Sequence, residues 1–519
     1  MSEGFSIRGV KLNAVQKWLL VLAAVSIVLV VTAVVKFGGL RRPNLLASLP
    51  RPEENAPLVI ITASEGGFPS AIFGMLADSA TISPGGASPI SLFTPVIADA
   101  SQSALVVTEQ GYGLSVYGAF TLKSDEMAQL AKGALPPAWA EHFVMPETAM
   151  DEDGVLRVNS LSASSPLFIE LSGNVAYVAD AKSNISRIRD VRAKTIGGID
   201  HEWRVETSWE SHIFINDGGV SGAITSGAED VSERENPLSL EVAWRSPGSS
   251  QGNGEPSTEA RWQLWGLENY IDDAFSASLK KFDWSGRDYF MPSPLIAAIG
   301  VNLPDPGKNV RTDRIFPSAI KTIAGHLGQI GLKTSETQNI LTGPAVLSLG
   351  GRTQVLWFEL PGITIDISGR GKTATKLVEH FWSETFMGAA PKPVPGFSAG
   401  GATDLPFSIL AAANDDRAVI GLTAPDVEMD TNVKSLLERE NSAIGWIYVN
   451  LPRLGASLSE MSSVNALLYE DADSGGGWNE DGTASSERRG AETLQQALGN
   501  LGSVLVLCDA PYKGRAYWY

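Results

Sequence analysis

The chain begins with one long apolar run and then changes to short alternating segments. Residues 18–35 read WLLVLAAVSIVLVVTAVV, eighteen residues with no charge and no proline. As a helix this run would be about 27 Å long, close to the hydrocarbon thickness of a bilayer. No second run of this kind follows. The pattern predicts a single transmembrane helix over 18–36, preceded by a short cytoplasmic tail, 1–17.

A cleaved signal peptide is the alternative to an anchor. Signal peptides use an apolar core of about 7–15 residues, and the small-residue site Val31-Thr32-Ala33 lies inside the run. A lipoprotein signal is excluded because the only cysteine is Cys508. Basic residues flank both ends, so the positive-inside rule leaves the orientation open. A short tail, one span and a long chain with one cysteine favour a single-pass signal-anchor at a bacterial inner membrane, with the large part periplasmic.

Beyond the run, apolar residues alternate in short segments bounded by Gly, Pro, Asn and Asp, which is typical of strands. In the C-terminal half we expect strands at 295–301, 345–349, 354–360, 363–367, 407–412, 418–422, 444–450 and 503–508. Gly350-Gly351 is expected to form a tight hairpin turn. Helical periodicity predicts helices at 127–132, 373–385 and 434–440. Hairpins outnumber crossovers, so the predicted fold class is α+β, with antiparallel sheets that carry helices on one face.

The same order of segments occurs twice, and the length of 519 residues suits two or three domains. The pentamer FPSAI stands at 68–72 and again at 316–320. Similar segments surround both copies in the same order: 57–60 and 294–297, 104–120 and 345–360, 166–169 and 406–409, 213–216 and 447–450. This collinearity predicts a duplication. We expect two related antiparallel-sheet-plus-helix domains, at 57–271 and 291–519, after a linker at 37–56.

Three stretches are expected to be loops because they are rich in Gly, Pro, Ser or acidic residues: 246–259, 388–406 and 471–488. Charge is unevenly divided along the chain. Residues 1–51 hold seven Lys or Arg and one Glu, a net charge of +6. The remaining residues hold 33 Lys or Arg against 57 Asp or Glu, a net charge of −24. Nucleic acid is therefore not an expected partner, whereas the basic residues beside the run suit lipid headgroups.

Motifs that carry chemistry are weak. Residues 369–373, GRGKT, stand between a strand and a helix like a phosphate-binding loop, but Asp366 replaces the first glycine. Asp471–Gly476 begins like a calcium loop, yet Gly482 stands where a bidentate Glu is required. Residues 151–154, DEDG, are a shorter variant. Ser278 and Lys281 fit S-x-x-K without the other motifs of that enzyme class.

The five histidines have no metal-binding spacing. His201-Glu202 comes closest to acid–base material, but neighbours on a strand point to opposite faces. The sequence therefore assigns no catalytic, cofactor-binding or metal-ligating residue. An enzyme would need residues that converge from distant segments.

Tryptophans crowd one stretch: Trp203, Trp209, Trp244, Trp262 and Trp265, with Trp284 nearby. Sheet packing accounts for most of them, and exposed ones beside loops would line a groove for a glycan, a lipid or a protein. The expected function is a membrane-anchored extracytoplasmic binding or envelope-assembly protein, with a ligand groove between its duplicated halves. The alternative is a hydrolase of envelope polymers. The expected partners are the lipid bilayer, through residues 18–36, and an envelope protein, glycan or lipid.

Overall fold

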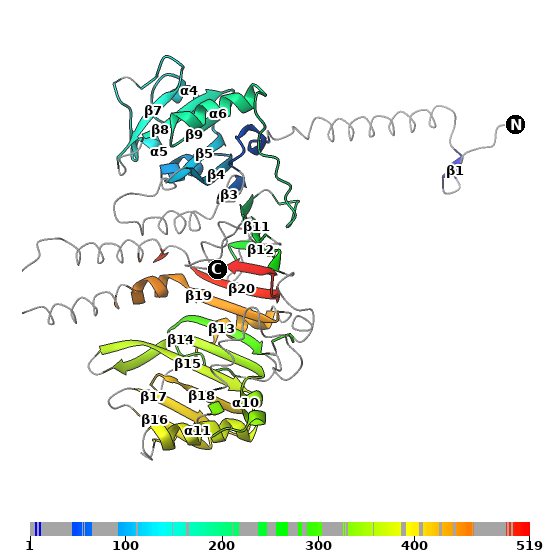
Figure 1. The fold of residues 1–519 in the computed structure, drawn as a ribbon, viewed down its shortest axis with the longest axis vertical. Helices are drawn as coiled ribbons and strands as arrows, with labels where there is room; N and C mark the ends of the chain where they lie inside the picture. Colours follow the sequence, from blue (N-terminus) through cyan, green and yellow to red (C-terminus); the bar gives the residue numbers. More distant parts are fainter. Residues whose placement is uncertain are drawn as a thin grey trace, which may run out of the picture.

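The structure, a computed structural model, describes Ser6–Ile7, Val10–Lys11 and most of residues 44–64, 92–303, 325–460 and 495–519, with internal gaps of which the longest is 217–236. The chain is an α+β protein built on one large antiparallel sheet (Figure 1). The apolar run 18–35 and both FPSAI pentamers lie outside the described residues. Among the residues that are described, no helix has the length and apolar character needed to cross a membrane.

The first series of strands comes from the N-terminal half. In space its order is β6-β7-β8-β9-β5-β4-β3-β10-β11-β12, and every pairing is antiparallel. The bounds are β3 (Leu58–Ser64), β4 (Gln102–Gln110), β5 (Gly113–Thr121), β6 (Phe143–Val144), β7 (Leu156–Ser160), β8 (Pro166–Ser172), β9 (Val175–Ala179), β10 (Ser211–Ile215), β11 (Ser239–Arg245) and β12 (Thr258–Trp265).

The second series of strands comes from the C-terminal half, and its order is β16-β17-β18-β15-β14-β13-β19-β20-β21, again antiparallel throughout. When the two orders are aligned with β7 opposite β16, every strand of one series has a counterpart in the other, and counterparts have equivalent neighbours in the sheet. The bounds are β13 (Leu295–Leu303), β14 (Gly343–Val355), β15 (Phe358–Ser368), β16 (Ala399–Thr403), β17 (Ile409–Ala413), β18 (Arg417–Leu422), β19 (Gly445–Asn450), β20 (Ser503–Ala510) and β21 (Lys513–Trp518).

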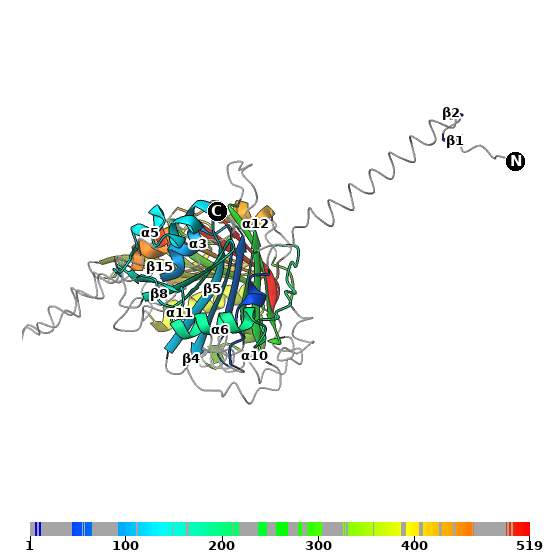
Figure 2. The same ribbon diagram turned by 90° about the horizontal axis from the view of Figure 1, so that it is seen from above.

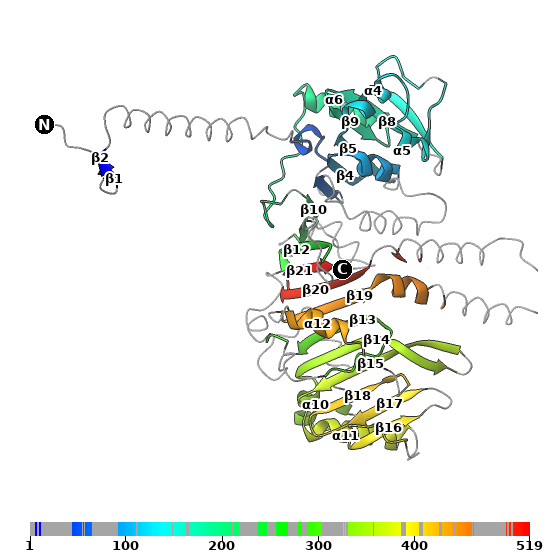
Figure 3. The same cartoon turned by 180° about the vertical axis from the view of Figure 1, so that it is seen from behind.

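The two series join edge to edge. Strand β12 pairs with β21, so that Ala260 lies opposite Ala516 and Arg261 opposite Arg515. Gly514 leaves room for the Trp262 ring at this junction, because a Cβ there would lie 2.9 Å from that ring. The same Cβ would also lie 1.9 Å from the carbonyl oxygen of Leu507 on the other neighbouring strand, β20. Figure 3 shows β12, β21 and β20 between the two ends of the molecule. The described strands β3 to β21 therefore form a single sheet.

Helices cover both faces of the first series, so the expectation of helices on one face is wrong. We call the face that carries Ile61 and Leu105 face A, and the face that carries Ile60 and Val106 face B; each set is buried. Face A packs against α3 (Thr94–Asp99), α4 (Ser124–Ala131) and α5 (Pro137–Ala140). Face B packs against η1 (Leu46–Ser48) and α6 (Lys182–Arg192). Seen along the long axis, α3 and α6 lie on opposite sides of β5 (Figure 2).

The same two faces continue through the second series, because paired residues of antiparallel strands point to the same side. On face A, α11 (Lys372–Thr385) covers β16, β17 and β18, and α10 (Thr334–Ile340) packs beside α11; Ala374 and Val378 share one buried cluster with Ala411. On face B, α12 (Asn432–Arg439) buries Val433 and Leu437 against β19 and β20.

Several elements are confirmed within about three residues of the sequence-based prediction, including β18, β19, β20, α11 and α12. The prediction for Gly350-Gly351 is wrong. Strand β14 continues through both glycines to Val355, and Gly351, with φ +65°, lies at a bulge where the pairing with β15 shifts register. A hairpin turn and a bulge both need a residue at positive φ, so the glycines alone do not distinguish them.

Two segments that we expected to be irregular take part in the folded core. Strand β16 lies inside the predicted loop 388–406, and β12 begins within the predicted loop 246–259. In the predicted linker 37–56, Leu45, Leu46 and Leu49 are at most 5% exposed and pack on face B. The predicted loop 471–488 lies outside the described residues.

Candidate functional site

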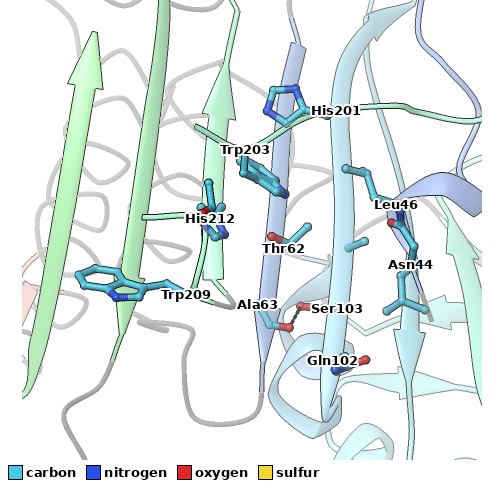
Figure 4. Close-up of a pocket in the computed structure, with 13 residues that line it drawn as sticks. Asn44, Leu46, Thr62, Ala63, Gln102, Ser103, His201, Trp203, Trp209 and His212 are labelled. Carbon is cyan, nitrogen blue, oxygen red and sulfur yellow. Dashed lines mark hydrogen bonds between the residues drawn. The ribbon is translucent and has the colours of Figure 1, made fainter. Parts of the chain in front are cut away.

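A cavity of about 310 Å³ lies on face B of the first series, against β3, β4 and β10. Three residues of one cross-strand row line its floor, since His212 pairs with Thr62 and Thr62 with Ala104. Residues of the irregular segment 201–209 and of η1 line its sides (Figure 4). The cavity therefore brings together segments that are far apart in the sequence, as ligand sites commonly do.

Glu241 on β11 holds the irregular segment in place. Its carboxylate is fully buried, and Oε1 accepts the backbone N–H groups of Arg204 and Val205, both at 2.6 Å. The guanidinium of Arg204 lies 3.7 Å from Oε2 and stacks on Trp265, 4.1 Å from the ring centre. Hydrogen bonds to a buried carboxylate are strong because little solvent competes for them. This buried carboxylate fixes the segment above the sheet.

Aromatic rings and imidazoles form one wall of the cavity. Trp203 lies between the two histidines, stacked on His212 at 4.6 Å between ring centres and edge-on to His201 at 4.5 Å (Figure 4). His201 also contacts Phe214 at 4.4 Å. The stack leaves part of Trp203 exposed to the cavity.

Both histidines are held in the uncharged form. Burial lowers the pKa of His212, although its hydrogen bonds to backbone carbonyls and the charge of Glu241 oppose the shift. Burial also lowers the pKa of His201. Nε2 of His212 carries the proton, because it donates to the carbonyl oxygens of Val205 at 3.1 Å and Glu206 at 3.3 Å. At neutral pH the wall therefore carries no positive charge.

The remaining lining is also uncharged. None of the described residues that line the cavity is Asp, Glu, Lys or Arg. Besides the wall and floor, Asn44, Gln102 and Thr207 offer amide and hydroxyl groups, and the lining is completed by Leu45, Leu46, Ala63, Ser103 and Trp209. This combination suits a small uncharged ligand with one apolar face and several polar groups.

The side chains at the cavity are not arranged as a nucleophile and base. The described partners of His212 Nε2 are backbone carbonyls, and the hydroxyl of Ser103 donates to the carbonyl of Ala63 at 3.5 Å. Among the described residues, no three His, Cys, Asp or Glu side chains are grouped to hold a metal ion. The cavity thus presents groups for binding rather than the geometry of a catalytic pair.

The phosphate-loop candidate, residues 369–373, is a packed turn between β15 and α11. The backbone N–H groups of Gly369 and Arg370 both donate to the carbonyl of Asp416, at 2.7 and 3.3 Å. The Arg370 side chain is 1% exposed, and its Nε donates to the carbonyl of Ile340 at 3.0 Å. These two amides are therefore engaged within the protein and do not point at a phosphate.

Asp366, which stands at the first position of that motif, has a structural role. It is fully buried on face B and forms an ion pair with Arg417 at 2.6 Å. It also accepts the backbone N–H of Phe290 at 2.6 Å. Burial raises the pKa of Asp366, while the charge of Arg417 opposes the shift.

Two carboxylates of the described acidic motif, residues 151–154, are paired within the fold. Asp151 accepts the backbone N–H groups of Val155 at 2.8 Å and Asp153 at 3.0 Å. Lys182 then pairs with Asp151 at 2.7 Å and with Asp153 at 2.8 Å. The calcium-loop candidate 471–482 and Ser278 of the S-x-x-K candidate lie outside the described residues, as do His326 and Trp284.

The tryptophans of the cluster lie in different surroundings, and Trp265 stacks with Arg204. Trp244 is 1% exposed in the core of the first series, whereas Trp203 and Trp209 line the cavity. The cavity lies within the first series. The two halves meet elsewhere in the sheet, through the pairing of β12 with β21. His201 belongs to an irregular segment, so its expected place on a strand is wrong.

Comparison with known proteins gives little. No protein-family model matches the chain, and no curated protein matches its sequence. Among solved structures, crystal form III of TP0453 matches with a TM-score of 0.27 and 9% sequence identity, over 46% of this chain and 85% of that chain. At this TM-score the likeness supports no inference about the chain.

The lowered histidine pKa predicts a loss of stability in mild acid. Because the folded state disfavours the charged form of His212, the unfolded state binds more protons below the usual pKa near 6.5. The free energy of unfolding therefore falls as pH decreases through that range, by up to about 1.4 kcal/mol per pH unit for one histidine. His212→Gln keeps a donor for the two carbonyls but does not titrate. Between pH 7.5 and 5.5 we expect its free energy of unfolding to fall by about 1 kcal/mol less than that of the wild type.

Urea denaturation at the two pH values measures this difference. His142→Asn, at an exposed position, is the matched control and should follow the wild type. Equal losses in the wild type and His212→Gln would show that His212 does not couple folding to pH.

Proposed function

We propose that the chain is a membrane-anchored extracytoplasmic binding or envelope-assembly protein, held at a bacterial inner membrane by one transmembrane helix at 18–36. Its large part binds an uncharged ligand in the cavity beside Trp203. The observation that carries the binding role is the lining of that cavity. It combines two tryptophan side chains and several hydroxyl and amide groups with no charged side chain.

The position of η1 supports a site near the bilayer. Residues 37–43 separate the proposed helix from Asn44, and Asn44, Leu45 and Leu46 all line the cavity. A fully extended segment of that length spans at most about 25 Å. The cavity would therefore lie close to the membrane surface, where components of the envelope are exposed.

The order of the strands supports the proposed duplication. The two series share their spatial order from β7 and β16 onward, and α4 and α11 follow equivalent strands, as do α6 and α12. The FPSAI pentamer occurs in the β3–β4 connection and again in the β13–β14 connection. We infer two related domains, at 57–271 and 291–519, that share one sheet.

The chemistry of the lining favours a sugar as the ligand. An aromatic ring provides a flat surface for the C–H face of a pyranose, and hydroxyl and amide side chains match its hydroxyl groups. The absence of charge in the lining disfavours an acidic ligand, since a buried charge without a partner is costly. A neutral mono- or disaccharide unit of an envelope glycan therefore fits best.

We expect the full chain to bind N,N′-diacetylchitobiose with a saturating change in tryptophan fluorescence and to bind N-acetylneuraminic acid much more weakly. Removing the aromatic surface in Trp203→Ala should weaken binding about tenfold or more, because such a contact contributes about 1 kcal/mol beyond its buried area. Titration followed by fluorescence and calorimetry measures both effects.

Tyr512→Ala serves as the matched control, because Tyr512 lies outside the cavity in the β20–β21 connection and should leave the affinity unchanged. Binding that survives Trp203→Ala, or no saturable binding of the neutral sugar at millimolar concentration, would contradict the assignment of the cavity.

The proposed orientation predicts that residues after Lys36 lie outside the cytoplasm. Alkaline phosphatase fused to the C-terminus should be active, because it requires an oxidising compartment, and a fluorescent protein that folds only in the cytosol should stay dark. A truncation that begins at residue 37 provides the control and should reverse both results. A bright fusion to the full chain would overturn the orientation.

A further inference from the structure

An aliphatic patch lies on face A of the second series. We define it by six residues with 36–50% exposure on β13, β14, β15, β18 and β19: Ile299, Leu347, Ile363, Ile365, Leu422 and Ile447. Four of them form one cross-strand row, because Ile447 pairs with Ile299, Ile299 with Leu347, and Leu347 with Ile365. A contiguous apolar surface of this kind marks a place where something binds.

The equivalent surface of the first series is covered. Ile61 on β3, Leu105 on β4, Val116 on β5 and Ile213 on β10 are at most 6% exposed. Helix α3 packs against this surface, since its Val96 belongs to the same core cluster. Because α3 lies in the connection between β3 and β4, the first series covers its own face A with the chain that joins its first two central strands.

The corresponding connection of the second series runs from Leu303 at the end of β13 to Gly343 at the start of β14. It leaves the sheet beside the patch and returns to the same face, where Leu327 and Ile340 pack beside α11. Residues 304–324 lie outside the described residues. In their sequence and up to Leu327, apolar residues recur at helical spacing: Ile315, Phe316, Ala319, Ile320, Ile323, Ala324 and Leu327.

We propose that residues 315–327 bind the aliphatic patch as an amphipathic helix, with Phe316, Ile320 and Ile323 against Ile299, Leu347 and Ile365. The connection that contains this segment is anchored at Leu303 on β13 and at Leu327 beside α11, which gives the segment an effective local concentration in the millimolar range. A second copy of the chain or a lipid surface would have to compete with that tethered segment. The inference goes beyond the proposed ligand cavity, which lies on the other face of the other series.

Cysteine labelling tests the proposal. In a Cys508→Ser background, the full chain in nanodiscs carries Leu347→Cys, and a second sample carries Val144→Cys, at a position that is 47% exposed elsewhere on the sheet. We expect a maleimide to modify position 347 at least tenfold more slowly than position 144. Adding Phe316→Asp and Ile320→Asp should raise the rate at 347 to that at 144, because charged residues cannot stay against the patch.

Lys321→Ser, on the polar side of the same helical pattern, is the matched control and should leave position 347 protected. A thermal melt followed by circular dichroism verifies that each variant is folded, and the milder Ile320→Ser replaces the double substitution where it is not. Equal rates at 347 and 144 in the unsubstituted background overturn the proposal. The proposal is also overturned if position 347 stays protected after the segment is substituted. Protection that then disappears on dilution would identify a second copy of the chain on the patch, and protection that persists on dilution would identify the bilayer.

Discussion

The pairing of β12 with β21 joins the two series of strands into one sheet. An edge strand exposes unpaired backbone N–H and C=O groups, and a protein must protect them from pairing with another chain. Here the last strand of each series satisfies the other, from Thr258 opposite Trp518 to Gln263 opposite Lys513. One contact therefore removes two edges and aligns face A and face B across the molecule (Figure 1). Glycine at position 514 makes room for the ring of Trp262 across this pairing and for the Leu507 carbonyl of β20 on its other side.

Buried carboxylates on face B tie irregular segments to this sheet. Glu241 on β11 accepts two backbone N–H groups from the segment that borders the cavity, and Asp366 on β15 accepts the N–H of Phe290, just before β13. Each is fully buried and has an arginine nearby, Arg204 or Arg417. Such groups are costly to bury unless their hydrogen bonds are made, so they fix where each segment lies. In the first series this fixed segment brings Trp203 over His212 and forms the cavity.

The sequence predicted the elements in which apolar residues follow a clear strand or helix pattern. It missed elements whose residue types suit more than one kind of structure. Strand β18 and helix α11 bury a regular set of apolar positions, and the prediction places both within one residue. Strand β16 was not predicted, because its sequence, AGGAT, has no β-branched residue before its final threonine and no alternation of apolar and polar residues. The bulge at Gly351 was taken for a turn because both need positive φ. The cavity could not be predicted from the sequence, because no sequence spacing links His201 and His212 to Thr62. The concentration of tryptophans was the one sequence feature that pointed to it.

Hydrogen exchange distinguishes one continuous sheet from two sheets whose edge strands are not paired. Along β12 and β21, alternate backbone N–H groups face one neighbour or the other. We expect slow exchange at every backbone amide from Thr258 to Gln263 and from Lys513 to Trp518, because both sides of each strand are paired. An alternating pattern, in which only the amides facing β11 or β20 are protected and the others exchange within seconds, would contradict the continuous sheet.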